Sequence, residues 1–410
     1  MANPTKSSRR NKPQRPLKAY PTFPLTVHPS GRWCKRIRSR LHYFGYWRNA
    51  DGSIKPDGGD WKTALELYKS QADDLHAGRT PRTDPDAVDV ADLVDRFLTS
   101  KRLRLDSGEL SARTFRDYYK ICEKLVRLLG KRRLVDDLRS DDFERMRAEL
   151  AKGVGPVTLS NDIGRIRSVF KYAYDADLTD KPVRFGTSFD KPSKKTLRLE
   201  RAKSGTRMFE AEELRRIFDA VPQPLKAMVL LGINCGFGNT DVATLPKSAV
   251  DLERGWVTFP RPKTGIERKC PLWPETIEAL REVIAQRPDP LERADADYVF
   301  LTRFGRRFVR MTDEDDPGQR RALDAIVGQF RKVLRKLDIN GKRNFYAIRH
   351  TFQTVAEESR DLPAVKSIMG HADNSMSAVY RERISDERLQ VVTAAVHEWL
   401  WPAKQEASDQ

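Results

Sequence analysis

The chain has 410 residues, and its 76 lysines and arginines exceed its 58 aspartates and glutamates, which gives a formal net charge of +18. A chain of this length exceeds one ordinary hydrophobic core, so we expect two or three domains. No apolar run reaches the length that spans a membrane, and the basic, polar first residues do not have the pattern of a secretory leader, so we expect neither.

The excess of positive charge indicates the class of partner, and the cysteines indicate the cellular compartment. A field of this sign concentrates polyanions, so nucleic acid is the leading partner class, with an unspecialised basic surface as the alternative. The widely spaced cysteines include no CxxC pair, which indicates reduced thiols in a cytoplasmic protein; they are Cys34, Cys122, Cys235 and Cys270. We therefore expect no disulfide framework, no metal site and no cofactor.

The first 77 residues predict a basic arm and a small module. Residues 1–20 are basic and rich in proline, which is typical of a disordered segment. Residues 21–77 predict short strands around a turn, closed by a helix over 61–77. In the second strand a period of two places four residues on one face: Cys34, Arg36, Arg38 and Arg40. Arginines aligned in this way suit a duplex groove, and a solvated edge strand is the alternative.

Residues 87–185 predict a compact helical domain. Four segments place apolar residues at helical spacing, and Ser111 stands at the cap position of the second. The fourth segment interleaves its apolar residues with basic ones that we expect to contact DNA: Arg165, Arg167 and Lys171. Residues 186–206 follow as a basic linker whose Lys194 and Lys195 are suited to lie along phosphates.

Residues 207–402 predict a larger domain that mixes helices with strand-like pieces, and 403–410 predict a tail. Strands are expected at 256–259 and 269–273, and Lys263 lies in the loop between them. Helices are expected at about 276–286 and 319–337. The second helix carries one apolar stripe, made of Leu323, Ile326, Phe330, Val333 and Leu337. The predicted fold class is therefore mostly α with small β-sheets.

Four residues of this domain suggest one reaction. Arg349 lies in a predicted helix, His371 follows the helix stop at Gly370, and Tyr380 follows nine residues later. With Lys263 they suit attack by a phenol on a phosphodiester, since cations favour the phenolate and stabilise charge on the phosphorane oxygens. Each also has an ordinary explanation, as an exposed loop lysine, a structural arginine, a capping histidine or a core tyrosine.

The segments around these residues resemble the tyrosine recombinases, or phage-type integrases. The resemblance rests on "AIRHTF", "IMGHADNSMSAVY" and "VTFPRPKTGIERKCPL", and it covers nearly the whole chain. It implies a catalytic domain at 207–402, a core-binding (SAM-like) domain at 87–185 and an arm-binding module at 21–77. It also implies a clamp around double-stranded DNA, a 3′-phosphotyrosyl intermediate at Tyr380, a homo-tetramer on DNA and possible accessory DNA-bending proteins. No ATP would be needed, because the intermediate keeps the free energy of the phosphodiester.

Two of the six active-site positions depart from the family pattern. Gly238 stands where the family has its first phosphate-binding arginine, whereas the acidic residue three positions later is kept as Asp241. Tyr346 stands where histidine or lysine is usual. Losing one donor to a developing oxyanion costs roughly 10²–10³ in rate, and losing a phosphate-facing arginine roughly 10³–10⁵.

The glycine leaves two hypotheses open. The protein binds DNA without cleaving it, or another cation fills the position, with Arg261, Arg268 and Arg381 as candidates. We favour a working or residually working enzyme of the recombinase type, with activity reduced by the glycine, and a relaxing activity of the type IB topoisomerase kind is a third hypothesis. We also expect Gly238 to have either a positive φ or a closely packed backbone.

Three further features of this domain are expected to be structural. His350 lies about 100° around its helix from Arg349, and His397 lies between apolar residues, so both are interpreted as packing residues. The segment 385–402 predicts an amphipathic helix that packs on its own or on a neighbouring catalytic domain. In the family, such tails couple the subunits of a tetramer.

Overall fold

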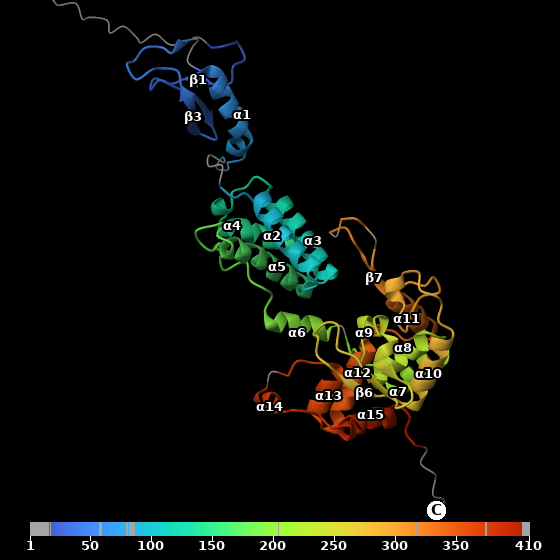
Figure 1. The fold of residues 1–410 in the computed structure, drawn as a ribbon. Helices are drawn as coiled ribbons and strands as arrows, with labels where there is room; N and C mark the ends of the chain where they lie inside the picture. Colours follow the sequence, from blue (N-terminus) through green and yellow to red (C-terminus); the bar gives the residue numbers. More distant parts are fainter. Residues whose placement is uncertain are drawn as a thin grey trace, which may run out of the picture. The chain divides into compact units, whose positions relative to one another are not determined.

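The computed structural model describes residues 16, 18–56, 60–78, 81, 87–203, 205–312, 314–316, 318–373 and 375–403. The chain forms two compact units, one made of residues 1–110 and 118–191 and the other of residues 111–117 and 192–410 (Figure 1). Nearly all of the predicted basic arm and of the predicted tail lies outside the described residues. No described helix is both long and apolar enough to cross a membrane.

The first unit begins with a three-stranded antiparallel sheet and one helix. The strands β1 (Thr26–Val27), β2 (Arg32–Ile37) and β3 (Arg40–Tyr46) lie in the order β1-β2-β3, and α1 (Trp61–Ala77) packs on them. The module has its own aromatic core, made chiefly of Phe23, Trp33, Phe44 and Trp47. The predicted strands and helix are therefore confirmed.

The predicted row of arginines on one strand face is wrong. The chain reverses at Arg38 and Ser39, whose φ values of 48° and 65° suit the two-residue turn of a hairpin. Arg36 is exposed on β2 and Arg40 begins β3, whereas the Arg38 guanidinium donates to the carbonyl of Ala77 at 2.8 Å. A period of two predicts a common face only while the strand continues.

Four helices complete the first unit. They are α2 (Val90–Asp106), α3 (Ala112–Leu129), α4 (Ser140–Ala151) and α5 (Pro156–Asp175). Ser111 caps α3, because its hydroxyl accepts from the N–H of Thr114 at 3.2 Å. The apolar faces meet in a core with Phe97, Phe143 and Ile163 at its centre. All four predicted helices are confirmed.

The predicted basic linker contains a helix. Residues Lys194–Ala202 form α6, with Ser193 as its cap, because its hydroxyl accepts from the N–H of Thr196 at 3.1 Å. The segment is rich in Lys, Leu, Arg and Glu, which are good helix formers, although its basic composition alone suggested an irregular chain. Phe189, within the predicted linker, is fully buried in the core of the first unit.

The second unit contains most of the helices and two small sheets. The helices are α7 (Ala211–Ala220), α8 (Leu225–Asn234), α9 (Asn239–Ala243), α10 (Pro274–Ala285), α11 (Ala325–Lys336), α12 (Tyr346–Ala356), α13 (Leu362–Met369), α14 (Met376–Val379) and α15 (Asp386–Leu400). One sheet contains β4 (Val250–Asp251), β5 (Trp256–Thr258) and β6 (Lys269–Pro271), and the other β7 (Val309–Met311) and β8 (Ala322–Asp324). Short 3₁₀ turns lie in this unit at Lys247–Ala249, Arg293–Asp295 and Glu357–Ser359, and in the first unit at Val135–Asp137.

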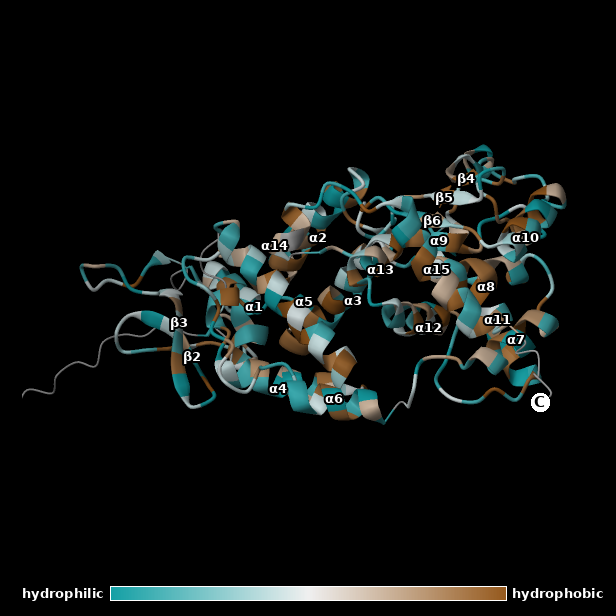
Figure 2. Cartoon of the chain, turned by 90° about the horizontal axis from the view of Figure 1, so that it is seen from below, coloured by the Kyte–Doolittle hydropathy of each residue, from teal (hydrophilic) through white to brown (hydrophobic). Residues whose placement is uncertain are grey.

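The core of this unit surrounds α8. This helix is apolar along its length, and α10, α12 and α15 pack against it (Figure 2). The helix expected at 319–337 begins later, at Ala325, because Asp324 caps it by accepting from the N–H of Val327 at 2.9 Å. Leu323 consequently lies in β8 and is 40% exposed, so it is not part of the predicted stripe.

The C-terminal helix packs on its own domain. Its apolar residues Leu389, Val392, Val396 and Leu400 are at most 3% exposed and belong to the core of the second unit. His397 lies between the rings of Trp273 and Trp401, at centroid distances of 5.1 and 4.9 Å, so its interpretation as a packing residue is confirmed.

Candidate active site

Arg349 is the buried cation around which the site is built. It lies on the inner face of α12 and is 2% exposed, and burial together with the charge of Arg261 lowers its pKa to about 10. Its Nη1 donates to the carbonyl of Gly236, and its Nη2 donates to the carbonyl of Met369 at 2.8 Å. These carbonyls compensate the loss of water and fix the direction of the remaining N–H groups.

His371 is held against Arg349 by the end of α13. Gly370 stops the helix with a φ of 60°, and the Nε2 atom of His371 then lies 2.8 Å from Nη2 of Arg349. Because a guanidinium can only donate, Nε2 is the acceptor, and the hydrogen of the neutral ring is on Nδ1. Burial and the charges of Arg349 and Arg261 lower the pKa of His371 to about 4, so the ring is neutral at pH 7. The Nδ1–H group is therefore available as a donor.

Gly238 begins α9 beside these two residues. Its φ of −96° and ψ of 177° are extended values that any residue adopts, so the expectation of a positive φ is wrong. Its N–H donates to Oδ2 of Asp241 at 2.7 Å. The other oxygen, Oδ1, accepts from Nη2 of Arg268 at 2.9 Å, while Nη1 of Arg349 lies 4.0 Å from Oδ2. Asp241 therefore joins the glycine to two cations.

The second departure, Tyr346, lies directly against the first. A Cβ atom on Gly238 would be 3.1 Å from Cε2 of Tyr346, which is closer than ordinary van der Waals contact. The Tyr346 ring is 42% exposed and meets the ring of His350 edge-on, with centroids 5.4 Å apart. The close packing expected around the backbone of Gly238 is thus present, and the side chain of Tyr346 provides it.

Lys263 lies at the tip of the hairpin between β5 and β6, where it was predicted. The hairpin loop rests on the turn that precedes His371, because Thr264 Oγ1 and Arg261 Nη1 approach the carbonyl of Gly370 at 3.2 and 3.4 Å. Lys263 itself is exposed and forms no hydrogen bond or ion pair within the described part of the chain. The loop thus holds this lysine close to the histidine turn while leaving its ammonium group unpaired.

Tyr380 is not brought against Arg349 and His371 in this structure. It ends the short helix α14, is 78% exposed, and its hydroxyl forms no hydrogen bond with any described residue. Figure 1 shows α14 standing away from α13 on extended segments. A role for Tyr380 beside Arg349 and His371 would therefore require a movement of this segment.

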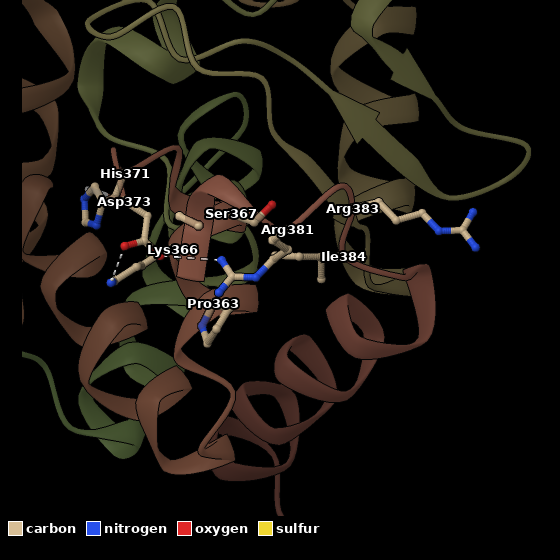
Figure 3. A pocket seen from close by; sticks show the side chains of 9 residues that line it. Pro363, Lys366, Ser367, His371, Asp373, Arg381, Arg383 and Ile384 are labelled. Atoms are coloured by element: carbon tan, nitrogen blue, oxygen red, sulfur yellow. Dashed lines mark hydrogen bonds and ion pairs between the residues drawn. The ribbon is translucent and has the colours of Figure 1, made fainter. Parts of the chain in front are cut away.

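A basic cavity of about 230 Å³ lies between α13 and the segment that carries Tyr380 (Figure 3). Its lining residues are Pro363, Lys366, Ser367, His371, Asp373, Ala378, Arg381, Arg383 and Ile384. The carboxylate of Asp373 lies 3.2 Å from Nζ of Lys366 and 3.5 Å from Nη1 of Arg381. Hydrogen bonds from Ser375 and Lys366 lower the pKa of Asp373 to about 2. Neither Lys366 nor Asp373 was predicted from the sequence; the position of Asp373, two residues after His371, was the available signal.

The basic residues proposed to contact DNA have different surroundings. Arg167 donates to the carbonyl of Phe189 at 2.8 Å and to Asp190 at 2.7 Å, so it holds the end of the first unit. Arg165 lies 3.7 Å from Asp162, and Lys171 lies 2.6 Å from Asp175. Lys194 and Lys195 are exposed in the first turn of α6. As DNA contacts these residues, with Arg36 and Arg40, remain predictions.

Sequence comparisons relate this chain to known proteins. Residues 207–387 match the family model described as the phage integrase family. The chain is 25% identical to the tyrosine recombinase XerC of Alcanivorax borkumensis over 309 residues, which covers 72% of this chain and 91% of the relative. It is 23% identical to the tyrosine recombinase XerD of Listeria innocua, over 70% of this chain and 93% of the relative.

Solved structures share the fold. The Tn1549 transposon integrase, in complex with transposon right end DNA, matches with a TM-score of 0.55 at 17% identity, over 76% of this chain and all of that chain. A lambda integrase dimer bound to a COC′ core site matches with a TM-score of 0.51 at 16% identity, over 93% of this chain and 99% of that chain. At this identity the likeness concerns the fold, which agrees with the predicted class of helices and small sheets.

Proposed function

We propose that this chain, whose residues 207–387 belong to the phage integrase family of tyrosine recombinases, is a working site-specific DNA recombinase with Tyr380 as its nucleophile. The observation that carries the proposal is the hydrogen bond of 2.8 Å between Arg349 and His371, two residues of the family pattern. Arg349 lies in α12 and His371 follows the end of α13, and the hairpin loop that carries Lys263 rests on the turn before His371. An abandoned site would have no need to keep this arrangement.

The proposed reaction follows from the donors present. The Tyr380 oxygen attacks the scissile phosphorus, the P–O5′ bond breaks, and the 3′ phosphate becomes joined to the tyrosine. Arg349 and the Nδ1–H group of His371 donate to the non-bridging oxygens, where negative charge develops. Lys263 gives a proton to the leaving 5′ oxygen, and the phenol proton is lost more readily because the surrounding cations favour the phenolate.

The partners follow from the same proposal. The net charge of +18 suits double-stranded DNA, and the exposed lysines of α6 are proposed to meet its phosphates. Strand exchange would use a homo-tetramer, as in the lambda integrase tetramer bound to a Holliday junction, whose structure matches with a TM-score of 0.52 at 15% identity. Accessory DNA-bending proteins are possible further partners.

A second candidate function is a DNA-binding protein that keeps the fold without cleavage. Gly238 favours it, because the family places a phosphate-binding arginine there, and so does the exposed hydroxyl of Tyr380. A supercoiled plasmid with two copies of a selected binding site separates the candidates. Recombinant products support the proposal, relaxation alone supports a topoisomerase-like activity, and binding without either product supports the silent protein.

A further inference from the structure

Two guanidinium groups lie beside one carboxylate in the candidate active site, and a third arginine, Arg261, packs with Arg268 around Gly370. Arg268 pairs with Asp241 at 2.9 Å, and Arg349 lies 4.0 Å from the same carboxylate. The charge of Arg261 lowers the pKa of both Arg349 and His371, after burial in each case. The cluster thus holds more positive charge than Asp241 balances, which suits a bound anion.

Arg268 is too deeply buried to touch this anion, because even its Nη1 atom, which has no hydrogen-bond partner among the described residues, is closed to solvent. Its side chain is 1% exposed, and its guanidinium lies over the ring of Phe237, 4.0 Å from the centroid. Its Nε donates to the carbonyl of Phe259 at 2.8 Å, and its Nη2 is used by Asp241. Arg268 therefore positions Asp241 from below the site.

Arg381 is committed to a different carboxylate. Its Nη1 lies 3.5 Å from Asp373, which also binds Lys366, and Figure 3 shows the three side chains grouped in the cavity beside α13. The low pKa of Asp373 keeps this carboxylate charged over the working range of pH. The side chain of Arg381 is consequently held by a carboxylate, which it shares with Lys366.

Unlike the buried Arg268 and the paired Arg381, Arg261 is placed to reach a bound anion. It is partly exposed, and within the described residues it has no carboxylate partner. Its side chain packs over Gly370, where an added Cβ would be 2.9 Å from the Cβ atom of Arg261, and its Nη1 points to the Gly370 carbonyl at 3.4 Å. Its backbone is also fixed, because the N–H donates to the carbonyl of Ile266 at 2.8 Å.

We propose that Arg261 is a catalytic residue that binds the scissile phosphate in place of the arginine missing at Gly238. The inference rests on the proposed recombinase function and names the residue that makes it possible. Arg261 reaches the phosphate from the lysine hairpin, whereas a side chain at position 238 would reach it from the start of α9. The two positions supply the same guanidinium to one anion from different elements.

The test is single-turnover cleavage of a nicked duplex that traps the covalent intermediate. Arg261→Met keeps the aliphatic stem over Gly370 and removes the charge, so we expect cleavage to fall by roughly 10²–10⁵ while the Kd for DNA changes by less than about tenfold. Gly238→Arg in the Arg261→Met background should restore part of the rate, and Gly238→Arg alone should change it little. Arg254→Ala is the matched control, because Arg254 is 86% exposed in the turn that joins β4 to β5.

A second substrate distinguishes contact with the phosphate from a structural role. A neutral methylphosphonate at the scissile position removes the charge that Arg261 would balance, so the defect of Arg261→Met should shrink on this substrate. Equal cleavage by the parent protein and Arg261→Met would overturn the inference and leave the proposed function intact. An unchanged defect on the methylphosphonate would overturn it as well. Absence of cleavage by the parent protein would instead contradict the proposed function.

Discussion

The ring of Tyr346 lies against Gly238, so that a Cβ atom on the glycine would be 3.1 Å from the ring carbon Cε2. These are the two positions at which the site departs from the family pattern, and they are far apart in the sequence. Their contact indicates that the departures are linked, because the tyrosine ring takes part of the space that a side chain at position 238 would need. A change at one position therefore alters what the other tolerates.

The stability of variants at these two positions should show this coupling. Gly238→Ala is expected to cost less free energy of unfolding in a Tyr346→Ala background than in the parent protein, by about 0.5 kcal/mol or more. The backbone of Gly238 has ordinary φ and ψ values, so the difference reports the ring contact alone. Urea unfolding measures it, with Gly328→Ala as control, since nothing lies within 4 Å of an added Cβ there. Equal costs in the two backgrounds would show that the ring does not constrain the glycine.

Removal of Arg268 should destabilise the second unit. Asp241 and Arg268 are both buried, and deleting Arg268 leaves Asp241 with only Arg349, 4.0 Å away, so we expect Arg268→Ala to cost about 3–5 kcal/mol. The loss should be smaller when Asp241→Asn is added, because the stranded charge is then removed. Chemical denaturation followed by tryptophan fluorescence measures both, with Arg254→Ala expected to stay within about 0.5 kcal/mol. A small cost for Arg268→Ala would mean that Asp241 finds another partner.

The stability of the protein should decrease as the pH is lowered, because of the titration of His371. Its pKa is about 4 in the folded chain against an ordinary 6.5, because of burial and the charges of Arg349, Arg261 and Lys366, which Glu357 only partly offsets. Between these values the unfolded chain binds more protons, so this contribution to stability is complete above pH 6.5 and is lost as the pH falls towards 4. His371→Gln should flatten that part of the profile.

Histidine NMR titration gives a direct reading of the same group. A bound phosphate analogue adds an anion beside the ring, so the pKa of His371 should rise when the site is filled. For the pH dependence of stability, the control is His42→Gln, because His42 lies in the first unit. A folded His371 with an ordinary pKa would contradict the contact with Arg349.

Deletion of the C-terminal helix should unfold the second unit. The apolar residues of α15 lie in its core, and loss of each large buried side chain costs about 2–5 kcal/mol. Truncation after Arg383 therefore tests folding and not subunit coupling. Val391 is 61% exposed on the outer face of the helix, so Val391→Asp should leave the unfolding transition in place and report any role in assembly on DNA. A truncated chain that unfolds cooperatively, with unchanged midpoint, would show that α15 is dispensable.

Local patterns predicted most elements, whereas contacts between distant residues could not be read from them. Helical spacing and the glycine stop gave α12, α13 and the position of His371, because caps and periodicity act over a few residues. The packing of Tyr346 on Gly238 and the pairing of Arg268 with Asp241 depend on how separate elements meet. The turn at Arg38 was missed because neither Arg38 nor Ser39 is a usual residue for positive φ.

Isolation of the covalent intermediate is the decisive measurement of whether Tyr380 is the nucleophile of a working recombinase. A duplex selected from a random-sequence pool for binding is nicked close to each candidate scissile phosphate, so that the cleaved fragment diffuses away and religation fails. We expect a protein–DNA adduct whose peptide carries a nucleotide joined through its 3′ phosphate to Tyr380, and none with Tyr380→Phe. Tight binding to the same duplexes without any adduct, or an adduct that persists in Tyr380→Phe, would contradict it.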